Sequence, residues 1–134
     1  MDWLYLSGRI LYAMIFVGSG IGHFVQLEGM SRYAASKGLP APKILVLTSG
    51  VAILSGGLSV MLGIWMEIGT WLLFIFLTTS ALTIHTFWTL TDPPQKIVEQ
   101  AIFMRNLSMA GAALMLYWLV QTYGYGPFAV GRPL

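Results

Sequence analysis

The chain has 134 residues, of which 57% are hydrophobic and only 9% are charged, against roughly 25% charged residues in a typical soluble domain. It contains no cysteine, which excludes disulfide exchange, thiolate nucleophiles, iron–sulfur clusters and cysteine-ligated zinc. Its net charge of +2 comes without a run of Lys or Arg, so we exclude a nucleic-acid partner and assign the basic residues to lipid headgroups. We expect one membrane domain over residues 1–134, without room for a separate catalytic domain.

The first two predicted membrane spans are apolar stretches at about residues 4–26 and 44–64. Each has the roughly 20 residues that a helix needs to cross the hydrocarbon of a bilayer. Arg9 lies one to two turns inside the first span, from where its side chain can reach outward to the interface. This span lacks the basic segment and the cleavage site of a secretory signal, so we expect it to be retained.

A short helix and then a break are expected between these spans. Leu27 to Lys37 places apolar residues at helical spacing, which suits a helix lying in the membrane interface. Gly38 should end this helix. Pro40 prevents its continuation, whereas Pro42 suits the first turn of the second span, where no backbone N–H is needed.

The third and fourth predicted spans cover about residues 68–90 and 95–122. Glu67 separates the second span from the third, so these two form a hairpin with a tight turn. Thr91 or Asp92 can cap the last helix, with two prolines in its first turn. The chain is therefore predicted to be an all-α integral membrane four-helix bundle, with a short interfacial helix between spans 1 and 2.

Alternating crossings sort the connections between the two membrane faces. The connections at 23–43 and 89–100 share one face, and both termini share the other face with the Glu67 turn. More Lys and Arg residues lie at the first face, so the positive-inside rule favours both termini outside. The tail, residues 124–134, is rich in Gly and Pro and is expected to be an exposed coil.

Small residues predict where the helices approach one another closely. Gly18 and Gly22 are four residues apart in the first span, and Ser59 and Gly63 are four apart in the second. Helices in lipid have no hydrophobic drive to associate, so small residues at this spacing let their backbones come into contact. We expect these four residues at helix–helix contacts.

Polar residues inside the spans fall into two groups. On the side of the termini, Arg9 and Glu67 lie at similar depth and are expected to form a structural ion pair. On the opposite side, three spans bring polar groups to one level. The candidate ligand-binding residues there are His23, His85, Trp88, Arg105 and Asn106.

Two interpretations of this level remain open. In one, the side chains satisfy backbone carbonyls, neighbouring side chains or lipid phosphate. In the other, they bind the head of an amphipathic guest, a quinone or a lipid, whose tail lies along apolar helices. Haem is disfavoured because each histidine lies close to a helix end and each helix offers only one. No metal site is expected, since Asp92, Glu28 and Glu99 add too few ligands.

Several segments resemble the DoxX family of small bacterial membrane proteins over residues 9 to about 120. The matching segments are Arg9-Ile-Leu-Tyr-Ala-Met-Ile-Phe, Ser19-Gly-Ile-Gly-His, Tyr33-Ala-Ala-Ser-Lys-Gly-Leu-Pro-Ala-Pro, Gly56-Gly-Leu with Leu62-Gly, His85-Thr-Phe-Trp and Phe103-Met-Arg-Asn-Leu-Ser-Met-Ala-Gly. The order of the Lys-Gly-Leu-Pro-Ala-Pro, His-x-Phe-Trp and Phe-x-Arg-Asn-Leu elements is the most specific part of this likeness.

The resemblance implies a four-helix bundle in the bacterial inner membrane, working beside membrane redox enzymes. Family members are associated with thiosulfate:quinone oxidation, terminal quinol oxidation and oxidative-stress complexes. It also implies that Arg9, His85, Arg105 and Asn106 occupy recurrent polar positions. Many relatives carry a glutamate about one turn before the paired glycines of the second span, where this chain has only apolar residues, 52–54. This difference argues against catalysis by the chain alone.

Two classes of function follow. The chain is expected to be a non-catalytic accessory subunit of a membrane redox or energy-converting complex, bordering a quinone or lipid site and contacting other membrane subunits. The alternative is an independent protein that binds or transports a small amphipathic molecule, or a quinone-linked oxidoreductase component. General acid–base chemistry by histidine lacks a visible carboxylate relay in the sequence.

Overall fold

The computed structural model describes all residues from Met1 to Leu134. In chain order its elements are α1 (Asp2–Val25), α2 (Leu27–Ser36), α3 (Pro42–Leu62), α4 (Met66–Thr83), the short 3₁₀ helix η1 (Phe87–Thr89) and α5 (Pro93–Tyr123). Four of these segments, the third running on through η1, are long and apolar enough to cross a membrane. The predicted all-α architecture, with a short helix between the first two spans, is confirmed.

Proline, glycine and aspartate set several of the helix ends. Pro42 occupies the first turn of α3, and Gly63 ends α3 with φ 69°, a left-handed conformation that glycine adopts without steric cost. The Asp92 carboxylate accepts a hydrogen bond from the Gln95 backbone N–H at 3.3 Å and so caps α5. These local signals fix the lengths of the helices and therefore the level at which their polar residues lie.

The third predicted span contains a break that was not expected from the sequence. A continuous helix to residue 90 was expected, but α4 ends at Thr83 and η1 begins only at Phe87. Thr83, Ile84 and Thr86 are β-branched, which lowers the helix propensity of this stretch. As a result His85 lies in a loop, and the direction of its side chain is not set by the register of a helix.

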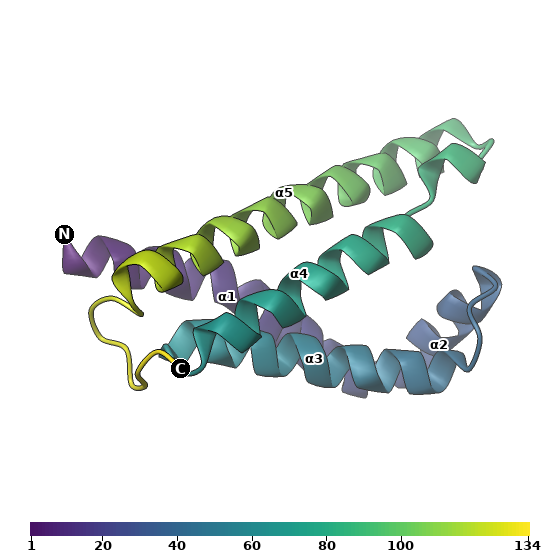
Figure 1. Cartoon of the computed structure of the whole chain (residues 1–134). Coiled ribbons are helices and arrows are strands. Elements are labelled where there is room, and N and C mark those ends of the chain that lie inside the picture. The colour runs from purple at the N-terminus through teal and green to yellow at the C-terminus, as the bar shows by residue number, and fades with distance from the viewer.

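The four long helices form two pairs, α1 with α3 and α4 with α5. The two pairs diverge toward one end of the molecule. α1 packs on α3, α3 packs on α4, and α4 packs on α5. Figure 1 shows the α4–α5 pair close to α3 near the α3–α4 turn and separating from it toward the end that carries α2 and η1. α1 does not pack directly on α5; the two are joined by the Tyr12 hydroxyl, which donates to the Met109 carbonyl at 3.0 Å.

The close approach of α1 to α3 occurs at Gly20 and not at the predicted Gly18 and Gly22. A Cβ on Gly20 would lie 2.7 Å from the Cβ of Leu54, whereas a Cβ on Gly18 or Gly22 would meet nothing within 4 Å. Gly20 is two residues from each, so it lies about 200° around the helix from them. The expectation chose the wrong face of the same helix.

Ser59 and Gly63 lie where α3 turns into α4. The Ser59 hydroxyl is 2.6 Å from the Ile64 carbonyl and 3.0 Å from the Trp65 carbonyl, both in the turn. A Cβ on Gly69 of α4 would collide with the Ser59 side chain, so the two helices touch closely at this point. A Cβ on Gly63 would collide with Ala129 of the C-terminal tail.

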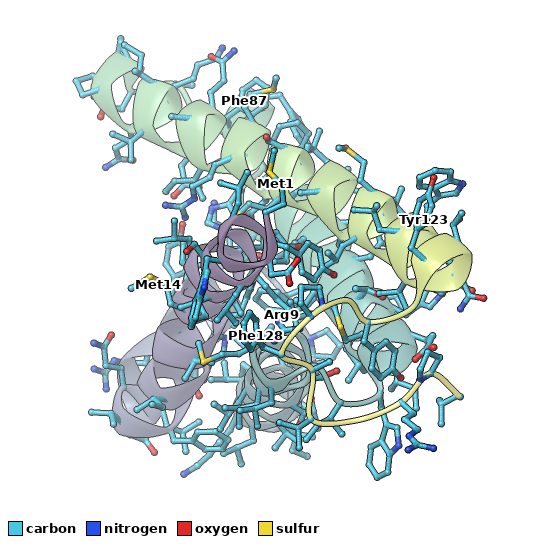
Figure 2. The ribbon with its side chains drawn as sticks, turned by 90° about the vertical axis from the view of Figure 1, so that its left-hand side faces the viewer. Met1, Arg9, Met14, Phe87, Tyr123 and Phe128 are labelled. Carbon is cyan, nitrogen blue, oxygen red and sulfur yellow. The ribbon has the colours of Figure 1, made fainter.

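The C-terminal tail, residues 124–134, has no helix or strand, as predicted, but it is not a free exposed coil, because it folds back over the α3–α4 turn and buries Tyr125. The Val130 N–H donates to the Leu62 carbonyl at 3.0 Å, and the Gly131 N–H donates to the Gly63 carbonyl at 2.8 Å. Tyr125 is only 3% exposed. Figure 2 shows Phe128 of the tail beside Arg9 of α1. The tail therefore closes the end of the bundle that carries both termini.

Candidate functional site

A pocket of about 920 Å³ lies between the two helix pairs and is lined by residues of α1, α2, α3, α4 and α5. Its walls are largely apolar and include Phe16, Val46, Leu72, Phe76 and Met109. Four predicted polar candidates also line it, namely His23, His85, Arg105 and Asn106. The divergence of the two helix pairs thus produces a space that is apolar along most of its length and carries a few polar groups.

His85 is held by a carboxylate from the neighbouring helix. Its Nδ1 lies 2.7 Å from Oε2 of Glu99 in α5, and both side chains are mostly buried. A carboxylate only accepts hydrogen bonds, so His85 Nδ1 carries the proton and Nε2 of the neutral ring remains a hydrogen-bond acceptor. The sequence showed no carboxylate relay for a histidine, and the structure places the Glu99 carboxylate next to His85.

Tyr33 of α2 binds the same carboxylate from the other side. Its hydroxyl donates to Oε1 of Glu99 at 2.8 Å, which joins α2 to α5 across the pocket. Partial burial and this hydrogen bond raise the pKa of Tyr33 to about 12. The phenol therefore stays protonated at physiological pH and acts as a donor.

His23 presents a second imidazole to the pocket. It is 5% exposed, and its Nδ1 lies 2.7 Å from the Ser19 carbonyl one helical turn earlier. The carbonyl can only accept, so Nδ1–H is the donor and Nε2 of the neutral ring is left as an acceptor. Phe76 packs against the ring, with centroids 5.9 Å apart.

Asn106 and Arg105 supply donors. Asn106 is 5% exposed and lines the pocket, yet no protein group is hydrogen-bonded to its side-chain amide. Its amide atoms are not among the fully buried atoms that lack a partner, so the amide is open to the pocket, where water or a ligand can bind it. Arg105 is more exposed and carries its positive charge at the same pocket.

Trp88 does not line the pocket, in contrast to its prediction as a ligand contact. It is 51% exposed and packs against Phe103, with ring centroids 5.7 Å apart, and against Phe87 at 5.2 Å. The cause is the helix break after Thr83, which moves the η1 segment onto α5. A continuous helix would have kept Trp88 in register with the residues of α4.

Glu99 and Tyr33 were missed as parts of this site. Glu99 precedes Asn106 by seven residues, or about two helical turns, so the two lie on the same face of α5. That spacing could have identified Glu99. Tyr33 had no such signal, because its contact depends on how α2 lies against the bundle.

Arg9 and Glu67 do not form the predicted ion pair. The structure contains one Lys–Glu ion pair, Lys43–Glu28, and the His85–Glu99 contact, which is an ion pair only when His85 is protonated. Arg9 donates to the Phe128 carbonyl at 3.0 Å and the Tyr125 carbonyl at 3.4 Å. Glu67 instead accepts from the Tyr125 hydroxyl at 2.5 Å and from the Leu134 N–H at 3.3 Å. The folded tail therefore supplies the hydrogen bonds of both side chains, and Arg9 Nε is left without a partner.

The polar groups of the pocket can bind an amphipathic head but do not form a metal centre. No group of three or more His, Asp or Glu side chains converges in the chain. The pocket offers acceptor nitrogens on His23 and His85 and donors on Asn106 and Arg105. Such a set can recognise a molecule that carries both a carbonyl oxygen and a hydroxyl group.

Comparison with known proteins gives matches over most of the chain. Residues 4–86 match the model of the DoxX family. The inner membrane protein YphA of Escherichia coli (strain K12) is 31% identical over 117 residues, which cover 84% of this chain and 80% of YphA. The inner membrane protein YqjF of the same organism is 27% identical over 132 residues, covering 96% of this chain and 90% of YqjF. No solved structure matches.

Proposed function

Because this chain belongs to the DoxX family and is a multi-pass inner membrane protein, we propose that it binds a quinone-like amphipathic molecule between its two helix pairs. The head would lie among His23, His85 and Asn106, and the apolar tail would lie along the helices. The proposal concerns binding. It assigns no electron transfer to this chain.

One observation carries the proposal. The Asn106 side chain, which is 5% exposed and has no hydrogen-bond partner in the protein, lines a largely apolar pocket of about 920 Å³. A site that buries polar groups for a ligand typically has this form, with apolar walls and a few convergent donors and acceptors. The two imidazoles add acceptors whose outer nitrogens are unused by the protein.

The chemistry of the lining favours a quinone or quinol head over a phospholipid head. Neutral imidazole Nε2 atoms accept from a hydroxyl, and the Asn106 amide donates to a carbonyl, so both redox forms of a quinone find partners. A phosphate head would need several cationic donors, and Arg105 is the only Lys or Arg residue that lines the pocket. A bound lipid is the competing result of the test below.

The test is the ligand content of the purified protein. We expect protein extracted in mild detergent to retain quinone, and Asn106→Leu to retain about tenfold less, since a tenfold change corresponds to 1.4 kcal/mol, within the range for one lost hydrogen bond. Ser108→Ala is the matched control, because Ser108 lies on the same helix, is exposed and does not line the pocket. Equal quinone content in all three proteins contradicts the proposal, and so does phospholipid as the retained molecule.

The accessory-subunit role expected from the sequence is a separate proposal. Residues of this chain alone supply the polar groups of the pocket that the quinone proposal uses, so independent binding is the proposal that we test first. Size-exclusion chromatography in mild detergent distinguishes them. Co-elution with redox subunits supports the accessory role, whereas a monodisperse species that retains quinone supports independent binding.

A further inference from the structure

A second, smaller hollow lies at the opposite end of the bundle, near the termini. It has a volume of about 400 Å³ and lies between the first turns of α1 and the later part of α5. Its lining residues are Met1, Leu4, Tyr5, Gly8, Arg9, Tyr12 and Leu116. The hollow exists because α1 and α5 do not pack directly on each other.

Arg9 carries a buried positive charge that no carboxylate neutralises. Its side chain is 2% exposed, and no ion pair in the structure includes it. Its guanidinium donates only to neutral carbonyls of the tail, and its Nε is buried without any partner. An unpaired charge inside a membrane protein is costly and usually marks a ligand or a pathway.

The nearby aromatic groups reduce this cost only in part. The Tyr5 ring lies 5.8 Å from the Arg9 guanidinium carbon, a cation–π contact. The hydroxyl of Tyr12 is already used by the Met109 carbonyl. Glu67, the acidic residue nearest in the predicted threading, is bound by the tail. An anion from outside the chain is the missing partner.

We propose that this hollow binds an anionic phospholipid, whose phosphate is drawn to Arg9 and whose acyl chains lie along the apolar side chains of Leu4 and Leu116. Arg9 is seven residues from the start of α1, about 10 Å along the helix, which is a depth suited to the boundary between headgroups and acyl chains. The guanidinium matches a phosphate in charge and geometry. This site is independent of the quinone proposal and lies at the other end of the bundle.

The test measures which lipid stays bound. The protein is reconstituted in vesicles of equimolar phosphatidylglycerol and phosphatidylcholine, extracted in mild detergent and analysed by native mass spectrometry. We expect phosphatidylglycerol to be enriched at least about fivefold over phosphatidylcholine in the retained lipid, as a charge-assisted contact predicts.

Two tryptophan variants distinguish lipid that binds in the hollow from lipid that contacts the outer surface of the helices. Leu116→Trp fills the hollow and keeps the charge of Arg9, and it should reduce the enrichment to about onefold. Leu114→Trp places the same ring on the same helix at an exposed position outside the hollow, and it should keep the enrichment. His85→Ala should also keep it, because His85 lies in the other pocket.

Arg9→Gln should abolish the enrichment as well. If this variant does not fold, the pair of tryptophan variants decides the question alone. The proposal is overturned if the wild-type protein shows no preference for phosphatidylglycerol. It is also overturned if Leu116→Trp keeps the preference, since the charge would then act from the surface and not through this hollow.

Discussion

The two ends of the bundle use their polar residues in opposite ways. At the end with the termini, the tail closes over Arg9 and Glu67 and binds both side chains by hydrogen bonds, which leaves only Arg9 Nε without a partner. At the other end, His23 and His85 are held through Nδ1 and Asn106 is not held at all, so hydrogen-bonding atoms remain free. The tail therefore stabilises one end of this small protein, whereas the other end keeps several hydrogen-bonding atoms available to a ligand.

Shortening a side chain at the closed end should therefore lower the free energy of unfolding more than shortening one at the open end. Tyr125→Ala removes a buried ring and its hydroxyl contact with Glu67, and it should lower the free energy of unfolding by about 3 kcal/mol, as aromatic-to-alanine changes in cores do. His85→Ala at the open end should cost less than about 1 kcal/mol. Unfolding in mixed micelles measured by circular dichroism gives both values. Equal losses would remove the distinction between the two ends.

The contact of α1 with α3 gives the second largest expected effect. Gly20→Ala introduces a Cβ 2.7 Å from the Leu54 Cβ, so it should destabilise the protein by about 1–3 kcal/mol through overpacking. Gly18→Ala and Gly22→Ala meet no neighbour and should be neutral or slightly stabilising because alanine favours helix. The same unfolding titration compares the three variants. A larger loss at Gly18 than at Gly20 would contradict the packing described here.

Alkaline pH gives a smaller and more specific effect. Burial, together with the hydrogen bond to Glu67, raises the pKa of Tyr125 to about 12, above the value of about 10 for an unperturbed tyrosine. A raised folded-state pKa means that this contribution is complete below pH 10 and is lost as the pH rises toward 12. Stability should therefore fall more steeply over this range in the wild-type protein than in Tyr125→Phe.

The control for this effect lies at the open end. Tyr33 also has a pKa raised to about 12, by burial and by its hydrogen bond to Glu99, but it is more exposed than Tyr125. Tyr33→Phe should therefore flatten the alkaline loss less than Tyr125→Phe does. Both are read from melting temperatures between pH 9 and 12, a range set by these tyrosine pKa values. The reverse order would show that Tyr125 of the tail contributes less to the alkaline loss of stability than Tyr33 of α2 does.

The sequence predicted the helices, and it predicted that four polar residues of the pocket lie near one another. Uncharged stretches located the spans, and Pro42 and Asp92 marked the starts of α3 and α5 as local chemistry requires. Alternate threading was enough to bring His23, His85, Arg105 and Asn106 to one pocket. These features follow from span length and order, which a sequence contains directly.

The remaining features depend on tertiary contacts that no local pattern encodes. Gly18, Gly20 and Gly22 are indistinguishable until the partner of α1 is known, and the structure selects Gly20. Tyr125 lies in a segment rich in glycine that is typical of a coil, yet it is buried by the α3–α4 turn. The pairing of Glu99 with His85 required the helix break after Thr83. Each is decided by packing between elements distant in sequence.

The binding claim is tested most directly by photolabelling with an azidoquinone in native membranes, followed by peptide mapping of the labelled chain. We expect labels on residues that line the pocket between the helix pairs, such as Phe76 and Met109, and much weaker labelling in Asn106→Leu. Labels confined to the exposed outer surface, at Trp118 or Met115 for example, and unchanged in that variant would contradict it.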